Sequence, residues 1–532
     1  MTSLLQQYAS AQAQARPDAT AVVMNAERVS YGELEASSNR LARFLKQVGC
    51  RRGDRVGLFL PKTPAAIAAM LGVLKADCIY VPIDVTSPAA RIERVLRVAE
   101  PRLLLAAGTA AALLDDLVAR AADGRLPPVA SVETGPIPGR RFESPYSSAD
   151  WAHESAEPLP WANSAGDPAH LLFTSGSTGT PKGVVITHSN VSHFVEWARG
   201  YFGLGASDRI SGHPPLYFDL STFDVYGTLS AGAQLHMVPP AANLLPHELA
   251  AFIRRSELTQ WFSVPSVLTY LAKFDAVAFD DYPALKRVLW CGDVLPTATL
   301  IHWMERLPHA TFTNLYGPTE TTIASSYYTV LRRPTGPGDV VPIGVPCAGE
   351  ELLVLDANLR PVRPGDAGHL YIAGVGLSPG YWGDEERTAA AFLPDPRAPE
   401  SQGRIYRTGD LARVGDDGLV YYLGRVDSQV KSRGYRIELG EVETAVNALP
   451  GLRECAVVGL STGGFEGTAI CCAYALRADA ERAPAQLRQE LARSLPTYML
   501  PSRWMSIDEL PKNANGKVDR NRLRELFGEG PA

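Results

Sequence analysis

The segment FTSGSTGTPKG at 173–183 carries the densest set of anion-binding groups in the chain. It places three glycines, several hydroxyls and Lys182 directly after an apolar run that ends at Phe173. Glycine lets a backbone approach phosphate oxygens closely, so N–H groups and hydroxyls can bind them. Pro181 stands where a Walker A loop needs Gly before its Lys, so that pattern is excluded. The segment predicts a phosphate loop of another kind, with a flexible Gly/Ser turn as the structural alternative.

The elements that would position this loop alternate between strand and helix patterns. Ser30 and Glu33 are spaced as a capping box before a helical pattern. Apolar runs at 56–60, 79–83 and 103–107 are typical of buried strands, and an Ala-rich helix is expected after Pro64. This alternation predicts an α/β fold with largely parallel strands.

The pattern changes after about residue 424. Two apolar strands at 455–460 and 469–476 surround a Gly-rich turn, and a helical stretch follows at 485–494. We therefore predict a large N-terminal domain of layered sheets and helices at 1–424 and a small, mobile α+β domain at 425–532. The segment 135–168, rich in Pro, Ser, Gly and Ala, is either a linker or a surface excursion.

Composition excludes several classes of protein. The 532 residues are too many for one core, and 46% hydrophobic with 20% charged residues is typical of a soluble globular protein. A net charge of -6 argues against a nucleic-acid binder. The seven cysteines form no CxxC pair, and Cys471 and Cys472 fall in a strand-like run, so buried reduced thiols are expected. The apolar stretch 103–114 is too short to span a bilayer and no signal peptide is evident, which predicts a cytoplasmic protein.

Further motifs lie before and after the phosphate loop. They are VSYGEL (29–34), LKADCIYVPID (74–84), FDLS (218–221), NLYGPTETT (314–322), YRTGD (406–410), GRVDSQVKSRGYRIELGEVE (424–443) and NGKVDR (515–520). With these motifs, nearly the whole chain resembles the adenylate-forming superfamily, which includes acyl- and aryl-CoA synthetases and luciferase. It is most similar to the adenylation domains of nonribosomal peptide synthetases and to D-alanine–carrier-protein ligases. The chain departs from the family pattern at two places. Asp77 stands where the family commonly has Gly, and SPGYW at 378–382 replaces the usual Ala-Arg-Gly-Tyr-Trp.

The resemblance implies an enzyme that joins a carboxylate to the α-phosphorus of ATP, with Mg²⁺, and releases pyrophosphate. No covalent enzyme intermediate is needed, so catalysis must come from positioning and charge neutralisation. The implied phosphate ligands are Thr174, Ser175, Thr178, Lys182 and Thr319. Glu320 would bind Mg²⁺, a hard cation that suits one carboxylate plus phosphate oxygens. The adenine would be held by Asn314 and Tyr316, and the ribose by Asp410 with Arg425.

Asp219, in FDLS, indicates the substrate class. In the enzymes that the chain resembles, this carboxylate pairs with the α-ammonium of an amino acid, and an unpaired charge in a pocket is costly. Lys517, in the NGK turn, would neutralise the reacting carboxylate and phosphate, and Asp427 would be the hinge. A helix-start carboxylate at Glu320, a turn residue at Asp410 and a solvated Lys517 are the structural alternatives.

The side-chain pocket follows from the same resemblance. Its expected wall is Leu220, Phe223, Phe262, Leu289, Cys291, Leu315, Ile323 and Ala324. An uncharged wall rejects charged side chains, and two Phe rings favour a small neutral substrate. We rank alanine of either hand first, because 289–296 resembles the D-alanine enzymes, then proline, then cysteine, serine or valine.

The expected function is activation of this amino acid as aminoacyl-AMP and transfer to the phosphopantetheine thiol of a separate carrier protein, in nonribosomal peptide biosynthesis. No membrane or nucleic-acid partner is expected. An acyl- or aryl-CoA ligase is one alternative, against which Asp219 argues. A non-catalytic nucleotide-binding protein is another, but it would be expected to have lost Lys517, Glu320 or Asp410.

Overall fold

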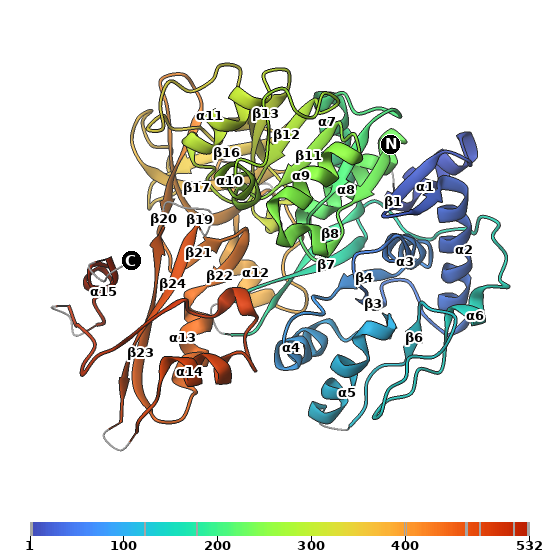
Figure 1. Cartoon of the computed structure of the whole chain (residues 1–532), viewed down its shortest axis with the longest axis horizontal. Coiled ribbons are helices and arrows are strands. Elements are labelled where there is room, and N and C mark those ends of the chain that lie inside the picture. The colour runs from blue at the N-terminus through green and yellow to red at the C-terminus, as the bar shows by residue number, and fades with distance from the viewer. Residues whose placement is uncertain are drawn as a thin grey trace.

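The computed structural model describes residues 4–121, 124–176, 179–397, 400, 402–462, 467–477, 480–513 and 517–528. Figure 1 shows a large body that runs from blue to yellow, with the orange and red C-terminal elements packed against one side of it. Among the described residues, no helix is both long and apolar enough to cross a membrane.

Two largely parallel sheets form the body. The first has the order β15 (Val345–Pro346), β14 (Ser326–Thr329), β13 (Thr311–Tyr316), β12 (Arg287–Trp290), β11 (Gln260–Ser263), β9 (Arg209–Gly212), β10 (Gln234–Met237), β1 (Thr20–Met24) and β2 (Glu27–Ser30). The second has the order β6 (Val129–Ser131), β5 (Leu103–Ala106), β3 (Arg55–Phe59), β4 (Ile79–Pro82), β7 (Pro168–Thr174) and β8 (Lys182–Thr187). Antiparallel pairs occur only at the ends of these orders. The α/β fold with largely parallel strands is confirmed.

A third sheet is antiparallel. It has the order β16 (Glu350–Leu355), β17 (Gly368–Gly374), β19 (Arg404–Val414) and β18 (Phe392–Pro394), with β20 (Val420–Arg425) paired to β19. The early strand–helix alternation gives no indication of this sheet, because it lies beyond the alternating region.

Helices cover these sheets. They are α1 (Leu5–Ala15), α2 (Tyr31–Gln47), α3 (Pro64–Lys75), α4 (Ala89–Ala99), α5 (Ala111–Arg120), α6 (Ser148–Trp151), α7 (His188–Phe202), α8 (Asp219–Ala231), α9 (Pro246–Arg255), α10 (Pro265–Lys273), α11 (Thr297–Arg306) and α12 (Glu385–Ala391). The predicted capping box is present at α2, where Ser30 and Glu33 exchange side-chain and backbone hydrogen bonds. Thr63 caps α3 and Pro64 occupies its first turn, as helix starts favour.

The C-terminal elements form a hairpin and a three-stranded sheet. The hairpin is β21 (Gln429–Ser432) with β22 (Tyr435–Glu438), and the sheet has the order β23 (Leu452–Ser461), β24 (Thr468–Leu476) and β25 (Arg503–Ser506). Their helices are α13 (Leu439–Asn447), α14 (Pro484–Leu491) and α15 (Arg520–Gly528). Cys471 and Cys472 face opposite sides of β24, each within a different apolar cluster. We keep 425–532 as the proposed small domain.

Asp77 holds the segment 135–168 against the body. It adopts a φ of 64°, a left-handed conformation that glycine adopts without strain and that Asp tolerates. Its carboxylate accepts hydrogen bonds from Lys46 Nζ at 2.8 Å and from the N–H groups of Ala162 and Asn163 at 2.7 and 3.1 Å. Trp151, in the same segment, packs against Phe44 of α2. The segment is therefore a surface excursion fastened to the large domain.

Candidate active site

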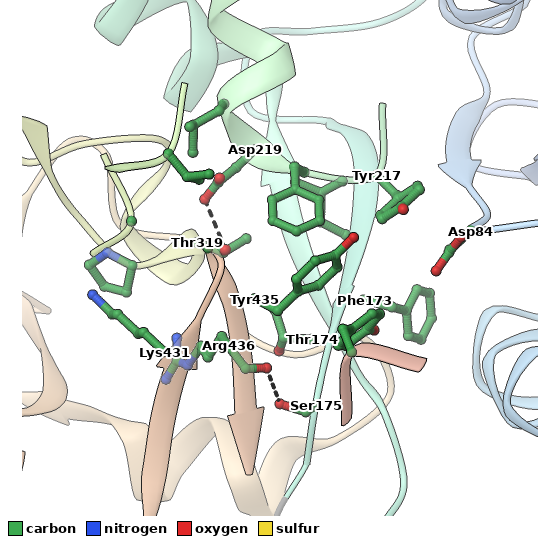
Figure 2. A pocket seen from close by; sticks show the side chains of 18 of the residues that line it. Asp84, Phe173, Thr174, Ser175, Tyr217, Asp219, Thr319, Lys431, Tyr435 and Arg436 are labelled. Carbon is green, nitrogen blue, oxygen red and sulfur yellow. Dashed lines mark hydrogen bonds between the residues drawn. The ribbon is translucent and has the colours of Figure 1, made fainter. Parts of the chain in front are cut away.

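A cavity opens where the body meets the hairpin β21–β22. Its lining comes from the end of β7, the start of α8, the turn after β13, and the hairpin itself. Figure 2 shows Asp219, Thr319, Ser175 and Arg436 around this space, with Tyr435 and Lys431 entering from the small domain. Segments far apart in sequence thus converge at the ends of strands and helices, where ligand sites in α/β folds occur.

Asp219 begins α8 and lies partly buried at the cavity wall. Thr319 Oγ1 donates a hydrogen bond to Asp219 Oδ2 at 2.9 Å (Figure 2). Desolvation raises the pKa of Asp219 to about 6, although hydrogen bonds from Thr319 and from the N–H of Leu220 oppose the rise. Within the described part of the chain Asp219 forms no ion pair, so its second oxygen can accept a cationic ligand group.

The phosphate loop is described on either side of its centre. Thr174 Oγ1 is shielded from solvent and finds no hydrogen-bond partner among the described residues, as expected of a group that binds a ligand. Ser175 Oγ instead donates to the backbone carbonyl of Arg436 at 2.7 Å (Figure 2). Thr178 lies outside the described residues. An orphaned hydroxyl beside a glycine-rich turn fits a phosphate group.

Glu320 is fully buried in a short 3-10 turn, Thr319–Thr321. Its carboxylate pairs with Arg436 Nη1 at 2.7 Å and accepts a hydrogen bond from Tyr381 Oη at 2.9 Å. Burial disfavours its ionised form, but Arg436 and Lys182 outweigh this and lower the pKa of Glu320 to about 2. Lys182 Nζ lies 5.2 Å from the centroid of the Tyr381 ring.

These residues fit a divalent cation only if the substrate supplies most of its ligands. Among the described residues, no three His, Cys, Asp or Glu side chains are grouped to hold a metal. Glu320 would be a single protein carboxylate that binds Mg²⁺ together with phosphate oxygens. In this domain arrangement Arg436 supplies the positive charge beside it.

A second cavity adjoins the first and contains both residues that are predicted to bind the adenine. Its lining includes Gly292, Asp293, Asn314 and Tyr316. Tyr316 Oη donates to Asp410 Oδ2 at 2.5 Å, and Arg425 Nη1 pairs with Asp410 Oδ1 at 2.5 Å. Consecutive hydrogen bonds therefore link Tyr316, which is predicted to bind adenine, to Asp410 and Arg425, which are predicted to bind ribose. Asn314 Nδ2 donates to the carbonyl of Pro342 at 2.9 Å. Adenine and ribose binding by these residues stays a prediction.

The predicted pocket wall forms one apolar cluster. All eight of its residues pack together: Leu220, Phe223, Phe262, Leu289, Cys291, Leu315, Ile323 and Ala324. The cluster is buried behind Asp219, and Leu220 and Cys291 reach the cavity lining. The structure therefore brings together residues that the sequence separates by about a hundred positions. Their contact with a substrate stays a prediction.

One part of this wall has a strained backbone. Thr322 and Ile323 have consecutive φ values of 62° and 68°. Both are β-branched, for which the left-handed region is strongly disfavoured. Thr322 Oγ1 donates to the carbonyl of Gly376 at 2.8 Å, which helps to hold the turn.

Lys517 and Asp427 do not line the first cavity. Lys517 is exposed on the small domain and lines neither of the two cavities. Asp427 is 42% exposed and pairs with Arg425 at 2.6 Å. The hairpin residue Gly434 instead lines the first cavity, beside Val264.

Sequence reasoning missed three residues of the site: Arg436 and Lys431, which line the first cavity, and Tyr381, which donates to Glu320. Arg436 and Lys431 are both in the motif 424–443, so the sequence shows two basic residues there. Only the arrangement of the two domains shows which groups these residues approach. Lys431 lines both cavities, with Nζ 5.6 Å from the centroid of the Tyr316 ring. Tyr381 belongs to SPGYW, whose Ser378 is buried and donates to the carbonyl of Val185 at 2.6 Å.

Replacing Cys291 with glycine is expected to admit larger apolar amino acids. Cys291 is buried in the wall, and burial raises its pKa to about 12, so it remains an uncharged thiol. A methylene-sized difference in an apolar pocket changes specificity by about 1–3 kcal/mol, so Cys291→Gly should improve kcat/KM for valine or leucine by about tenfold relative to the native substrate. Pyrophosphate exchange over an amino-acid panel measures this ratio.

Cys291→Ala should give an intermediate change, and Cys347→Ala serves as a control, since Cys347 is buried outside the wall cluster. An unchanged profile in Cys291→Gly would remove this residue from the pocket.

Comparison with known proteins shows the family to which the chain belongs. Residues 9–382 match the family model described as AMP-binding enzyme, and residues 441–517 match the AMP-binding enzyme C-terminal domain. An L-proline--[L-prolyl-carrier protein] ligase of Streptomyces coelicolor is 39% identical over 97% of this chain and 94% of its own length. A dimodular nonribosomal peptide synthase of Bacillus subtilis is 36% identical over 98% of this chain, which spans only 21% of that protein.

Two solved structures that contain adenylation domains share the fold of this chain. The Vibrio cholerae adenylation domain AlmE, in complex with glycyl-adenosine-5'-phosphate, superposes with a TM-score of 0.84 at 25% identity, covering 99% of this chain and 98% of its own. Holo-PA1221, which contains adenylation and PCP domains, gives 0.80 at 27% identity, covering 98% and 84%. Because the family model spans most of the chain and includes the phosphate loop and Glu320, the chain is a member of the AMP-binding, adenylate-forming ligase family.

Proposed function

We propose that this chain uses ATP to activate a small neutral amino acid as its aminoacyl-AMP and then transfers it to the phosphopantetheine thiol of a separate carrier protein. The observation that carries the proposal is Asp219, a carboxylate at the mouth of an apolar pocket without an ion-pair partner among the described residues. Such a carboxylate is stabilised by an α-ammonium group, which aryl and fatty acids lack.

We assign the residues around Asp219 to binding ATP and to excluding water from the reaction. We assign Thr174, Ser175 and Lys182 to binding phosphate oxygens, and Tyr316, Asp410 and Arg425 to holding the nucleoside. All of these except Lys182 line the first cavity. Mg²⁺ bound with the phosphates would neutralise charge beside Glu320. The apolar wall then excludes water and charged side chains from the reacting carboxylate.

Among small neutral substrates, we propose testing L-proline first and alanine of either hand second. The relative of nearly equal length, at 39% identity, is named for L-proline, and the eight-residue apolar wall suits either side chain. The preference for alanine inferred from 289–296 stays a prediction.

The hairpin position indicates which half-reaction this domain arrangement serves. Gly434 and Tyr435 line the cavity while Lys517 is outside it, so we propose that the structure represents the thiol-accepting arrangement. Adenylate formation would require the small domain to rotate and bring Lys517 in.

The test is pyrophosphate exchange with a panel of amino acids and their des-amino analogues. Exchange that depends on an amino acid, with proline or alanine best, supports the proposal. Equal exchange with the des-amino acids would favour an acyl- or aryl-CoA ligase. No exchange with any acid, despite ATP binding, would favour a non-catalytic nucleotide-binding protein.

A further inference from the structure

A buried ion pair joins the two domains beside the phosphate loop. Arg91 Nη1, from α4 of the large domain, lies 2.5 Å from Glu441 Oε1, from α13 of the small domain. The two side chains are only 9% and 1% exposed. Met499 Sδ, also from the small domain, lies 3.6 Å from the same guanidinium nitrogen. Both charges are therefore sealed from water only while the domains are together.

Neighbouring contacts tie the same part of the small domain to the loop. Arg94, one turn after Arg91 on α4, donates to the carbonyl of Gly179 at 2.8 Å and to that of Ser494 at 3.4 Å. Ser175 donates to the carbonyl of Arg436. In this arrangement small-domain atoms contact groups of the phosphate loop that we assign to ATP. While Ser175 donates to Arg436, its hydroxyl hydrogen is not available to a phosphate oxygen.

A buried ion pair of this kind affects the orientation in which the small domain docks more than the stability of the docked state. Removing two charges from water offsets most of their attraction, so a buried pair adds little net stability. Removing one partner, however, leaves the other charge buried and uncompensated, which is strongly unfavourable. A pair of this kind penalises any docking of the small domain in which the two charges do not meet.

We propose that Arg91 and Glu441 form a positioning pair that registers the small domain for the thiol-accepting half-reaction and has no part in adenylate formation. The proposal rests on the proposed function, since it presupposes two half-reactions. Arg91 itself lines the first cavity, whereas Glu441 does not. The pair acts by placing Gly434 and Tyr435 at that cavity.

The test compares the two half-reactions in Glu441→Gln, which keeps the side-chain shape and removes its charge. Pyrophosphate exchange should stay within about threefold of the native rate. Single-turnover transfer from preformed aminoacyl-adenylate to free pantetheine should slow at least tenfold. Glu443→Gln is the matched control: it lies on the same helix and breaks an ion pair with Arg520 inside the small domain, so both half-reactions should stay near native rates.

A double-mutant cycle separates pairing from a general loss of structure. Arg91→Gln combined with Glu441→Gln should be faster in transfer than the product of the two single losses predicts, because no buried charge is left unpaired. Strictly multiplicative losses, equal slowing of both half-reactions, or equal effects of Glu443→Gln and Glu441→Gln would overturn the proposal. A native enzyme without amino-acid-dependent pyrophosphate exchange would instead overturn the proposed function.

Discussion

Replacing Lys517 with alanine is expected to slow adenylate formation by about two to three orders of magnitude, the size of effect seen when one donor to developing charge is removed. The same variant should transfer a supplied aminoacyl-adenylate to pantetheine at close to the native rate. The reason is positional: Lys517 is exposed and outside both cavities in the arrangement that places Gly434 at the site. Pyrophosphate exchange and single-turnover transfer measure the two steps.

Lys512→Ala provides the control, because Lys512 is an exposed lysine nearby in sequence that pairs with Glu509.

A restrictive substitution at the hinge residue Asp427 should affect the two half-reactions in the opposite way. Asp427→Pro restricts the backbone and should impair transfer more than adenylation, whereas Asp427→Ala removes the bond to Arg425 without that restriction. Equal losses of both steps in Lys517→Ala and Asp427→Pro would show that the domain motion is arranged differently.

Replacing Asp219 with alanine is expected to lower kcat/KM for the amino acid by about 10²–10³-fold while ATP binding stays nearly native. Truncating one partner of a buried charge pair costs about 2–5 kcal/mol, and about 1.4 kcal/mol corresponds to tenfold. Asp219→Asn is the closer control, since its amide oxygen can still accept the hydrogen bond from Thr319. Activity on a des-amino acid equal to that on the amino acid would contradict the assignment.

The pH dependence gives a second measurement of Asp219. With a pKa of about 6, the free enzyme loses the carboxylate charge as the pH falls below 6, and a neutral carboxyl cannot pair with an ammonium. Native kcat/KM should therefore fall toward tenfold per pH unit on the acid side. The residual activity of Asp219→Asn should lack this limb.

Local pattern predicted much of the fold and part of the site. The strand–helix alternation indicated the parallel sheets, because periodicity and capping act within one element. Motif resemblance also indicated the eight wall residues, which do pack together. In contrast, Arg436 reaches Glu320 from the other domain, and no local pattern specifies how two domains dock. The same limit applies to Asp77, whose partners at 162–163 lie far along the chain in an apparent linker.

The left-handed turn at Thr322 and Ile323 implies a trade-off between robustness and selectivity. Residues held in such sparsely populated conformations cost about 1–3 kcal/mol each. Glycine at either position would relieve that strain, but it would remove the hydroxyl bonded to Gly376 or the isoleucine of the pocket wall. The segment next to Glu320 therefore cannot be optimised for fold stability and for substrate choice at once. Substitutions that raise the thermal stability of this enzyme should therefore be placed outside this turn, since relaxing the turn would broaden the range of substrates that the pocket accepts.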